Sequence, residues 1–259
     1  MKSVILAGGL GTRISEESYL KPKPMIEIGD QPILWHIMKE YSYYGVDDFI
    51  ICLGYKGYKI KEYFNDYYLH TSDVTFDFKE NKMITHNNHC ENWKVTLVDT
   101  GLHTLTAGRV KRIKEYVNGE TFFLTYGDGV SDVDINKLLE FHREHGKIAT
   151  ITSYYFGQRF GVIDVDETGT VTEFREKKSQ DGSLINAGYM VINPEIFDYL
   201  PEECDNIMFE EVLEKLAKDG QLAAYNHEGF WFGMDTQRDK MQLEKMWNSG
   251  NAKWKKWKD

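Results

Sequence analysis

Short apolar runs alternate with amphipathic segments over the first third of the chain. Residues 4–6 and 49–53 are continuous apolar runs, which are typical of buried strands. Residues 33–41 carry apolar side chains at helical spacing, and residues 59–67 are expected to form a second helix. The order strand, helix, strand, helix at this spacing predicts right-handed βαβ units and a parallel sheet.

The pattern changes after residue 70. Residues 74–78 alternate between apolar and polar side chains, and residues 83–86 can pair with them as a hairpin. Residues 70–99 are therefore expected to form a β excursion on the main sheet. The other elements that periodicity and turn residues predict are a basic helix at 106–116, a strand at 122–126, a helix at 134–145, a strand at 148–154, a hairpin at 161–174, a strand at 186–193, a helix at 207–218, and short strands at 223–226 and 230–232.

The end of the chain, residues 236–259, is expected to form a helix that stops near Trp247, followed by a tail. Residues 253–258 of this tail are four lysines and two tryptophans. The tail is too short to anchor stably to a membrane on its own, so packing of its tryptophans onto the domain or a neighbouring subunit is favoured. Because the chain shows no repeat and no low-complexity linker, residues 1–259 are expected to form a single α/β domain.

The composition narrows the class of protein. With 41% hydrophobic residues, a chain of 259 residues can bury a full core. Its formal net charge of −10 argues against a nucleic-acid partner, which needs clustered positive charge. The three cysteines include no C-x-x-C pair and are interpreted as reduced thiols. The chain starts with a core strand and has no apolar run near the ~18 residues of a membrane span, so a cytoplasmic protein without a membrane partner is expected.

Three glycines follow the first strand, in the stretch Leu6-Ala7-Gly8-Gly9-Leu10-Gly11-Thr12-Arg13. Glycine lets the backbone approach a ligand closely, consecutive N–H groups form an anion-binding concavity, and the Arg13 guanidinium suits phosphate oxygens. No Lys-Ser or Lys-Thr follows Gly11, which excludes a P-loop, and Ile14 breaks the dinucleotide fingerprint. The stretch therefore predicts a polyphosphate site of another kind, with a tight turn that holds no ligand as the alternative.

Asp128 and Arg109 are further candidates for chemistry. Asp128 stands between two glycines after the strand at 122–126, where open α/β sheets bind ligands, so it is either a metal ligand or the closing residue of an Asx-turn. Arg109 belongs to the basic helix and is either part of an anion site or part of a solvated face. His86 and His89 have no acidic or cysteine partner at ligand spacing and are interpreted as solvated loop residues.

The glycine stretch, followed by Lys21-Pro22-Lys23-Pro24-Met25, resembles the opening of the sugar-phosphate nucleotidyltransferases. The likeness covers essentially the whole chain, and the combination of motifs is far more specific than any one of them. The later stretches that occur in that family's order are Tyr126-Gly127-Asp128-Gly129, Glu176-Lys177, Asn186-Ala187-Gly188-Tyr189 and Trp231-Phe232-Gly233-Met234-Asp235-Thr236.

Within that family the chain is most similar to the members that join CTP to α-D-glucose 1-phosphate. The stretches that carry this likeness are residues 23–29, 54–57, 69–76 and 98–101, together with the tryptophan-rich tail. The resemblance implies that the chain makes CDP-glucose and pyrophosphate, with Mg²⁺ as cofactor. It also implies a Rossmann-like mixed, mostly parallel sheet flanked by helices, a homo-oligomer such as the family's hexamers, and a role in lipopolysaccharide O-antigen biosynthesis.

The resemblance also implies roles for single residues. Lys23 and Arg13 are expected to act in catalysis, Asp128 and Asp235 are expected to hold one Mg²⁺, and Lys177 is expected to pair with the sugar phosphate. The full set of expected substrate contacts is Leu6, Ala7, Gly8, Gly9, Leu10, Gly11, Thr12, Arg13, Lys23, Thr104, Arg109, Gly127, Glu173, Lys177, Asn186 and Gly188.

Several alternatives stay open. The family usually has a proline after Glu-Lys, whereas here Lys178 follows Lys177, so either lysine can face the sugar phosphate. Lys23 could be a solvated loop lysine instead of a catalytic one. The same reaction with UTP or dTTP, or a non-catalytic nucleotide-sugar sensor, would also fit the motifs. A nicotinamide-dependent oxidoreductase is disfavoured by Ile14.

Overall fold

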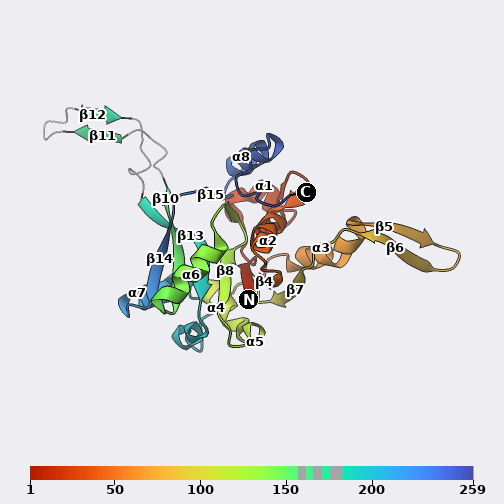
Figure 1. Cartoon of the computed structure of the whole chain (residues 1–259), viewed down its shortest axis with the longest axis horizontal. Coiled ribbons are helices and arrows are strands. Elements are labelled where there is room, and N and C mark those ends of the chain that lie inside the picture. The colour runs from red at the N-terminus through yellow and green to blue at the C-terminus, as the bar shows by residue number, and fades with distance from the viewer. Residues whose placement is uncertain (157–161, 166–170, 176–182, 259) are drawn as a thin grey trace.

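A seven-stranded sheet crosses the middle of the molecule (Figure 1). The computed structural model describes residues 1–156, 162–165, 171–175 and 183–258. From edge to edge the strands are β14 (Leu222–His227), β10 (Ala149–Phe156), β13 (Ser183–Ile192), β8 (Phe122–Tyr126), β1 (Lys2–Leu6), β4 (Asp48–Leu53) and β7 (Lys94–Asp99). β13 is antiparallel to β8 and β10, and the other neighbouring pairs are parallel. The expected mixed, mostly parallel sheet is thus confirmed.

Helices cover both faces of this sheet, because its central strands are apolar on both sides. In β1, Ile5 packs into the core on one face and Val4 and Leu6 pack into the core on the other. The helices that contribute to the first core are α2 (Ile33–Tyr43), α3 (Gly57–His70), α6 (Ile135–His145) and α8 (Gln237–Asn248). Those that contribute to the second core are α4 (Thr106–Arg112), α5 (Lys114–Val117) and α7 (Phe209–Lys218).

Four two-stranded pairs and several short helices complete the described part of the chain. The pairs are β2 (Glu27–Ile28) with β3 (Gln31–Pro32), β5 (Ser72–Asp77) with β6 (Lys82–Asn88), β9 (Gly129–Ser131) with β15 (Trp231–Gly233), and β11 (Val162–Val165) with β12 (Val171–Arg175). The short helices are η1 (Thr12–Ile14), α1 (Ser15–Ser18), η2 (Lys23–Met25) and η4 (Pro194–Tyr199).

Residues 70–99 follow the expectation only in part. β7 joins the main sheet at its edge beside β4. β5 and β6 instead pair with each other and project from the body beyond α3 (Figure 1). The hairpin itself was predictable from local alternation, but α3 carries the chain away from the sheet before β5 begins, so the hairpin forms a sheet of its own. The basic helix expected at 106–116 is also different, since Ile113 separates α4 from α5.

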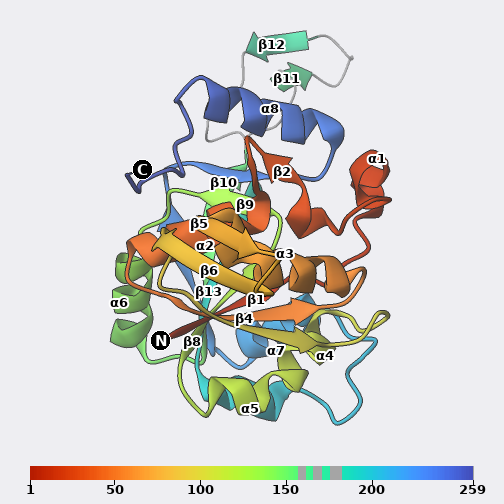
Figure 2. The ribbon, with the colours of Figure 1, turned by 90° about the vertical axis from the view of Figure 1, so that its right-hand side faces the viewer.

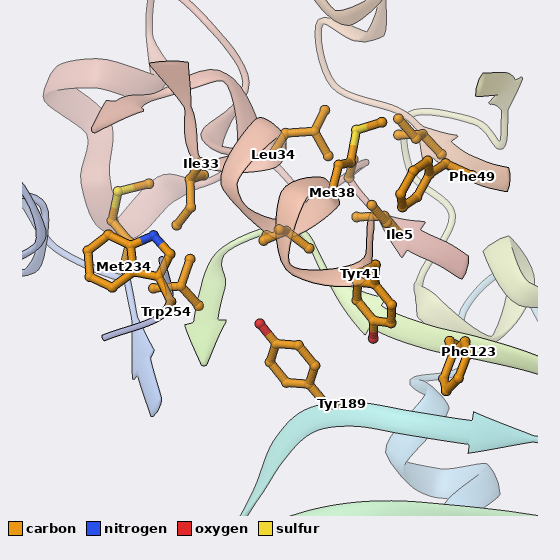
Figure 3. Packing of buried hydrophobic residues seen from close by; sticks show 14 of the residues in the cluster. Ile5, Ile33, Leu34, Met38, Tyr41, Phe49, Phe123, Tyr189, Met234 and Trp254 are labelled. Atoms are coloured by element: carbon orange, nitrogen blue, oxygen red, sulfur yellow. The ribbon is translucent and has the colours of Figure 1, made fainter. Parts of the chain in front are cut away.

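The C-terminal tail packs onto the domain, as the sequence favoured. The indole of Trp254 is fully buried and stacks near Trp247 and Phe230, with ring centroids 6.3 and 5.8 Å away. Figure 2 shows α8, which precedes the tail, lying beside β2, and Figure 3 shows Trp254 beside Met234 in the core. In the part of the chain that the structure describes, no helix combines the length and the apolar character needed to cross a membrane.

His36 of α2 connects this tail to the core. Its side chain is fully buried, and its two ring nitrogens face the carbonyl of Ile28 at 2.9 Å and the indole nitrogen of Trp254 at 3.3 Å. The indole N–H can only donate, so Nδ1 of His36 accepts and Nε2–H donates to Ile28, which requires the neutral ring. Burial accordingly lowers the pKa of His36 from its ordinary 6.5 to about 4.

We expect acid to weaken the fold through His36. The unfolded chain binds a proton on this residue at higher pH than the folded chain does, so its contribution is complete above pH 6.5 and is lost as the pH falls toward about 4. The free energy of unfolding, measured by urea denaturation, should fall by up to about 3 kcal/mol over this window. His36→Gln should remove this part of the pH dependence, and His70→Gln, at an exposed position, should keep it. Equal pH dependence in wild type and His36→Gln would contradict the assignment.

Candidate active site

A cavity of about 430 Å³ lies at the carboxyl ends of β1 and β8. This is the edge of an open α/β sheet at which ligands bind, and the volume suits a small molecule. The expected site residues that line it are Leu6, Ala7, Gly8, Gly9, Leu10, Gly11, Thr12, Arg13, Lys23, Thr104, Arg109, Gly127 and Asp128. The structure thus brings the glycine stretch, the loop after β7 and the loop after β8 to one place.

Gly8 and Gly54 let the glycine stretch approach the buried side chain of Arg109. A Cβ on Gly8 would lie 2.1 Å from Nη1 of Arg109, and a Cβ on Gly54 would lie 2.5 Å from the carbonyl oxygen of Gly8. That carbonyl accepts hydrogen bonds from Arg109 Nη2 at 3.0 Å and from the amide of Tyr55 at 3.1 Å. Glycine is needed at both positions because the backbones and the guanidinium are in direct contact.

Arg109 is 4% exposed and acts as a brace for the cavity wall. Besides Gly8, its guanidinium donates from Nη1 to the carbonyls of Leu53 and Gly101, at 2.9 Å each, and to Oγ1 of Thr100 at 2.7 Å. Charge-assisted hydrogen bonds of this kind offset the desolvation of a buried cation. Both terminal nitrogens of Arg109 already donate to protein oxygens. Its expected contact with CTP stays a prediction.

Lys23 lies at the junction of three segments. It begins η2, between Pro22 and Pro24, and its side chain is only 10% exposed. Its ammonium group donates to Oδ2 of Asp128 at 2.5 Å and to Oδ1 of Asp235 at 2.7 Å. Arg13 reaches the same Asp235 oxygen, with Nη2 3.0 Å away. A buried, doubly paired ammonium is inconsistent with the alternative of a solvated loop lysine.

The pairing of β9 with β15 places the two aspartates side by side. Gly129 and Gly233 are register partners, and the amide of Met234 donates to the carbonyl of Asp128 at 2.8 Å. Asp235 then precedes α8, whose N-cap is Thr236, and its own amide donates to the carboxylate of Asp239 at 3.2 Å. The two carboxylates therefore stand at adjacent ends of one antiparallel ladder, held by backbone hydrogen bonds on both strands.

The donor set at this point fits a magnesium ion. The oxygens of Asp128 and Asp235 converge on one cation, the ammonium of Lys23, and both side chains are partly exposed. Asp128 lines the cavity, whereas Asp235 is reached through Lys23 and is not among the lining residues. No cluster of three or more histidine, cysteine or acidic residues that could hold a metal occurs among the described residues. Two carboxylates without further protein ligands suit Mg²⁺, which keeps waters and binds substrate phosphates.

The residues expected to contact the sugar are placed less completely. Gly188 has φ of +80°, and a Cβ there would lie 2.6 Å from the ring of Tyr126, which lines the cavity. Asn186 accepts a hydrogen bond from the amide of Gly188 at 2.9 Å, and neither residue belongs to the described cavity lining. For Glu173 the structure describes the backbone, within β12, and Lys177 lies outside the described residues.

Several lining residues were not among the substrate contacts expected from the sequence. The rule that ligands bind at the carboxyl ends of strands could have indicated Leu102 and His103, which follow β7. Met208, the N-cap of α7, carries no local signal, because its place in the wall depends on how α7 packs against α4. The complete set of these additional lining residues is Ile14, Pro24, Leu102, His103, Leu105, Thr106, Tyr126 and Met208.

Known proteins share the sequence and the fold of this chain. A sequence model of the nucleotidyl transferase family matches residues 2–259. The chain is 54% identical over 258 residues to the glucose-1-phosphate cytidylyltransferases of Salmonella typhi and Salmonella typhimurium, covering 99% of this chain and 100% of each relative. Among solved structures, HddC from Yersinia pseudotuberculosis superposes with a TM-score of 0.68 at 25% identity, covering 95% of this chain and 99% of that one.

Because Gly54 and Gly8 are in direct contact, we expect Gly54→Ala to lower the stability of the fold. Gly54→Ala places a Cβ against a backbone oxygen and the guanidinium of Arg109, so the free energy of unfolding should fall by about 1–3 kcal/mol, as for other overpacked sites. Gly9→Ala is the matched control, since no heavy atom of the described residues lies within 4 Å of its Cβ position. It should change the free energy of unfolding by less than about 1 kcal/mol. Urea denaturation that shows Gly54→Ala as stable as wild type would contradict the proposed brace.

Proposed function

Since the chain belongs to the nucleotidyl transferase family, we propose that it joins CTP to α-D-glucose 1-phosphate and releases CDP-glucose and pyrophosphate. The observation that carries this proposal is the likeness to glucose-1-phosphate cytidylyltransferases over nearly the whole length of both chains. The cavity supports it, because the glycine stretch and Lys23, which pairs with Asp128 and Asp235, meet at the edge of the sheet where ligands bind.

The reaction requires positioning and electrostatics and does not require a protein nucleophile. A phosphate oxygen of glucose 1-phosphate attacks the α-phosphorus of CTP in line, the bond from that phosphorus to the bridging oxygen breaks, and pyrophosphate leaves with the bonding electron pair. Both reactants are anions, so they must be brought together against their repulsion. Preorganised cations and N–H groups at the reacting phosphates supply most of the rate enhancement in such reactions.

The glycine stretch and the two cations divide this task in our proposal. The backbone N–H groups of residues 8–12 and the guanidinium of Arg13, which is 72% exposed, face the triphosphate. Lys23 neutralises the charge that develops on the α-phosphate and the leaving oxygen. Its ammonium is already fixed beside two carboxylates, so little side-chain entropy is lost when the substrates bind.

Asp128 and Asp235 would hold Mg²⁺, which would offset charge on the phosphate oxygens of the nucleotide. On the other side of the site, Lys177 is proposed to pair with the sugar phosphate. Glu173, Asn186 and Gly188 are proposed to face the glucose hydroxyls. The tight contact of Gly188 with the ring of Tyr126 supports a role of this strand in shaping that side of the cavity.

We further propose that the chain assembles as a homo-oligomer, of which a hexamer is the form that the resemblance suggests. The hairpin of β5 and β6 supports this, because Phe76, Phe78 and Met83 are 52%, 90% and 42% exposed. Phe76 and Met83 are register partners, and the rings of Phe76 and Phe78 stack, so they form one apolar patch. A two-stranded hairpin is marginal in water alone, and a second copy of the chain would cover it.

The cellular location and the biosynthetic role that we propose for the reaction rest on the resemblance. We propose that it occurs in the cytoplasm and supplies an activated sugar for lipopolysaccharide O-antigen. A nucleotide-activated hexose is the chemical form in which sugar-modifying and glycosyl-transferring enzymes take up their substrate.

Pyrophosphate release tests the proposed reaction. The purified chain is incubated with glucose 1-phosphate, Mg²⁺ and one of CTP, UTP, dTTP, ATP or GTP, and release is followed over time. We expect the highest kcat/KM with CTP. Turnover with UTP or dTTP and not with CTP would contradict the choice of base. If no nucleotide gives release, the reaction is contradicted and the non-catalytic nucleotide-sugar sensor is the remaining function. Replacing Mg²⁺ with EDTA should abolish release, because the two carboxylates would then face the phosphates without a metal between them.

A further inference from the structure

Glu40 is a buried acid that the reaction as described does not use. It lies on α2, where it follows the helical spacing of the core residues Ile33 and Ile37, and it is 5% exposed. Its Oε1 accepts a hydrogen bond from the amide of Ser131 at 3.1 Å, and its Oε2 lies 2.5 Å from the hydroxyl of Tyr189. Burying a carboxyl group among apolar side chains is costly, so its partners indicate what it does.

Both partners belong to strands that carry or directly follow expected site residues. Ser131 ends β9, which begins directly after Asp128, and Tyr189 of β13 follows Gly188. The hydroxyl of Tyr189 also lies 3.1 Å from the carbonyl oxygen of Gly129. Figure 3 shows Tyr189 extending from β13 toward α2, with Tyr41 beside it. Glu40 and Tyr189 therefore hold β9 at its first and last residues.

Counting the available protons indicates the protonation state of Glu40. The carbonyl of Gly129 can only accept, and Tyr189 has one hydroxyl proton. Both contacts of the hydroxyl are satisfied when Tyr189 donates to Gly129 and a protonated Glu40 donates to Tyr189. Burial raises the pKa of Glu40 well above its ordinary value, which agrees with this arrangement, and the charges that face it, Lys256 and Asp132, have opposite signs.

β9 is the element that orients Asp128. On one side it pairs with β15, which places Asp235 next to Asp128, and on the other side it is held by Glu40 and Tyr189. If the second set of bonds is lost, only the packing of Val130 in the core holds β9 against α2, so the β9–β15 ladder can shift relative to α2 and β13. The carboxylate of Asp128 would then move relative to Lys23 and the nucleotide.

We propose that Glu40 and Tyr189 form a positioning pair that fixes β9, and through it the carboxylate of Asp128, for the metal-bound nucleotide. The inference rests on the proposed function, because Asp128 is a metal ligand only there. Partners that orient metal ligands without touching the metal commonly change metal affinity by about 10–100-fold when they are removed.

Calorimetric titration of CTP into the chain, without glucose 1-phosphate, measures this role in the absence of turnover. The readout is the ratio of the CTP affinity with Mg²⁺ to that with EDTA. We expect Tyr189→Phe and Glu40→Met to lower this ratio by about tenfold, with the CTP affinity in EDTA unchanged. Glu40→Gln should stay within about twofold of wild type, because its amide can accept from Ser131 and donate to Tyr189 as a protonated acid does.

Tyr41→Phe is the matched control. It removes a buried tyrosine hydroxyl from the same core, and within the described structure that hydroxyl makes no hydrogen bond to Glu40 or β9. It should leave the ratio unchanged. If Glu40→Met does not fold, Tyr189→Phe and Glu40→Gln still decide, and thermal melts identify folded variants. An unchanged ratio in Tyr189→Phe, or a ratio in Glu40→Gln as low as in Tyr189→Phe, would overturn the pair as described.

The same titration separates failure of the pair from failure of the proposed function. Wild type that binds no CTP would contradict the nucleotide assignment itself. Wild type whose affinity does not rise with Mg²⁺ would contradict the metal site and, with it, the pair. Wild type with a clear Mg²⁺ gain that every folded variant retains would contradict the pair alone.

Discussion

The ammonium group of Lys23 connects segments that lie far apart in the sequence. It pairs with Asp128 and Asp235, which are 105 and 212 residues away. A mostly buried ammonium is stable only when carboxylates compensate its desolvation, and two carboxylates this close to each other need a cation between them. The loop after β1, the loop after β8 and the start of α8 thus depend on one another electrostatically. The same balance of charge makes the place suitable for a metal and for phosphates.

Backbone contacts give this charged junction its geometry. The β9–β15 ladder brings the two aspartates together, and Glu40 and Tyr189 hold that ladder against α2. Arg109 donates to the carbonyls of Gly8, Leu53 and Gly101, and so it ties the glycine stretch to the ends of β4 and β7. Catalysis by preorganised electrostatics requires such rigidity, because reorganisation of the charged groups would use up the stabilisation that they provide.

Local patterns in the sequence predicted the parts of this arrangement that are themselves local. The strand at 4–6, the glycine stretch after it and Asp128 at the end of a strand follow from hydrophobic runs and turn residues. Asp235 and Lys23 were expected only from the resemblance to a family, because their meeting depends on the β9–β15 pairing. The hairpin of β5 and β6 was predicted correctly, but its predicted attachment to the main sheet was wrong. Alternation defines a pair of strands but not the sheet that they join. The acid Glu40 on an apolar helix face is a local signal of a buried carboxyl group, whereas no local pattern indicates its partner Tyr189, 149 residues later.

The proposed function gives Lys23 a catalytic role that depends on its position between Asp128 and Asp235. The direct measurement is the steady-state rate of pyrophosphate release by Lys23→Met, compared with Lys21→Met in the same loop, whose ammonium pairs with Glu27 at the surface. We expect kcat to fall by ~10²–10³ in Lys23→Met, as for other preorganised groups that stabilise developing charge, and to stay near the wild-type value in Lys21→Met. Equal rates in folded Lys23→Met and wild type would contradict this catalytic role.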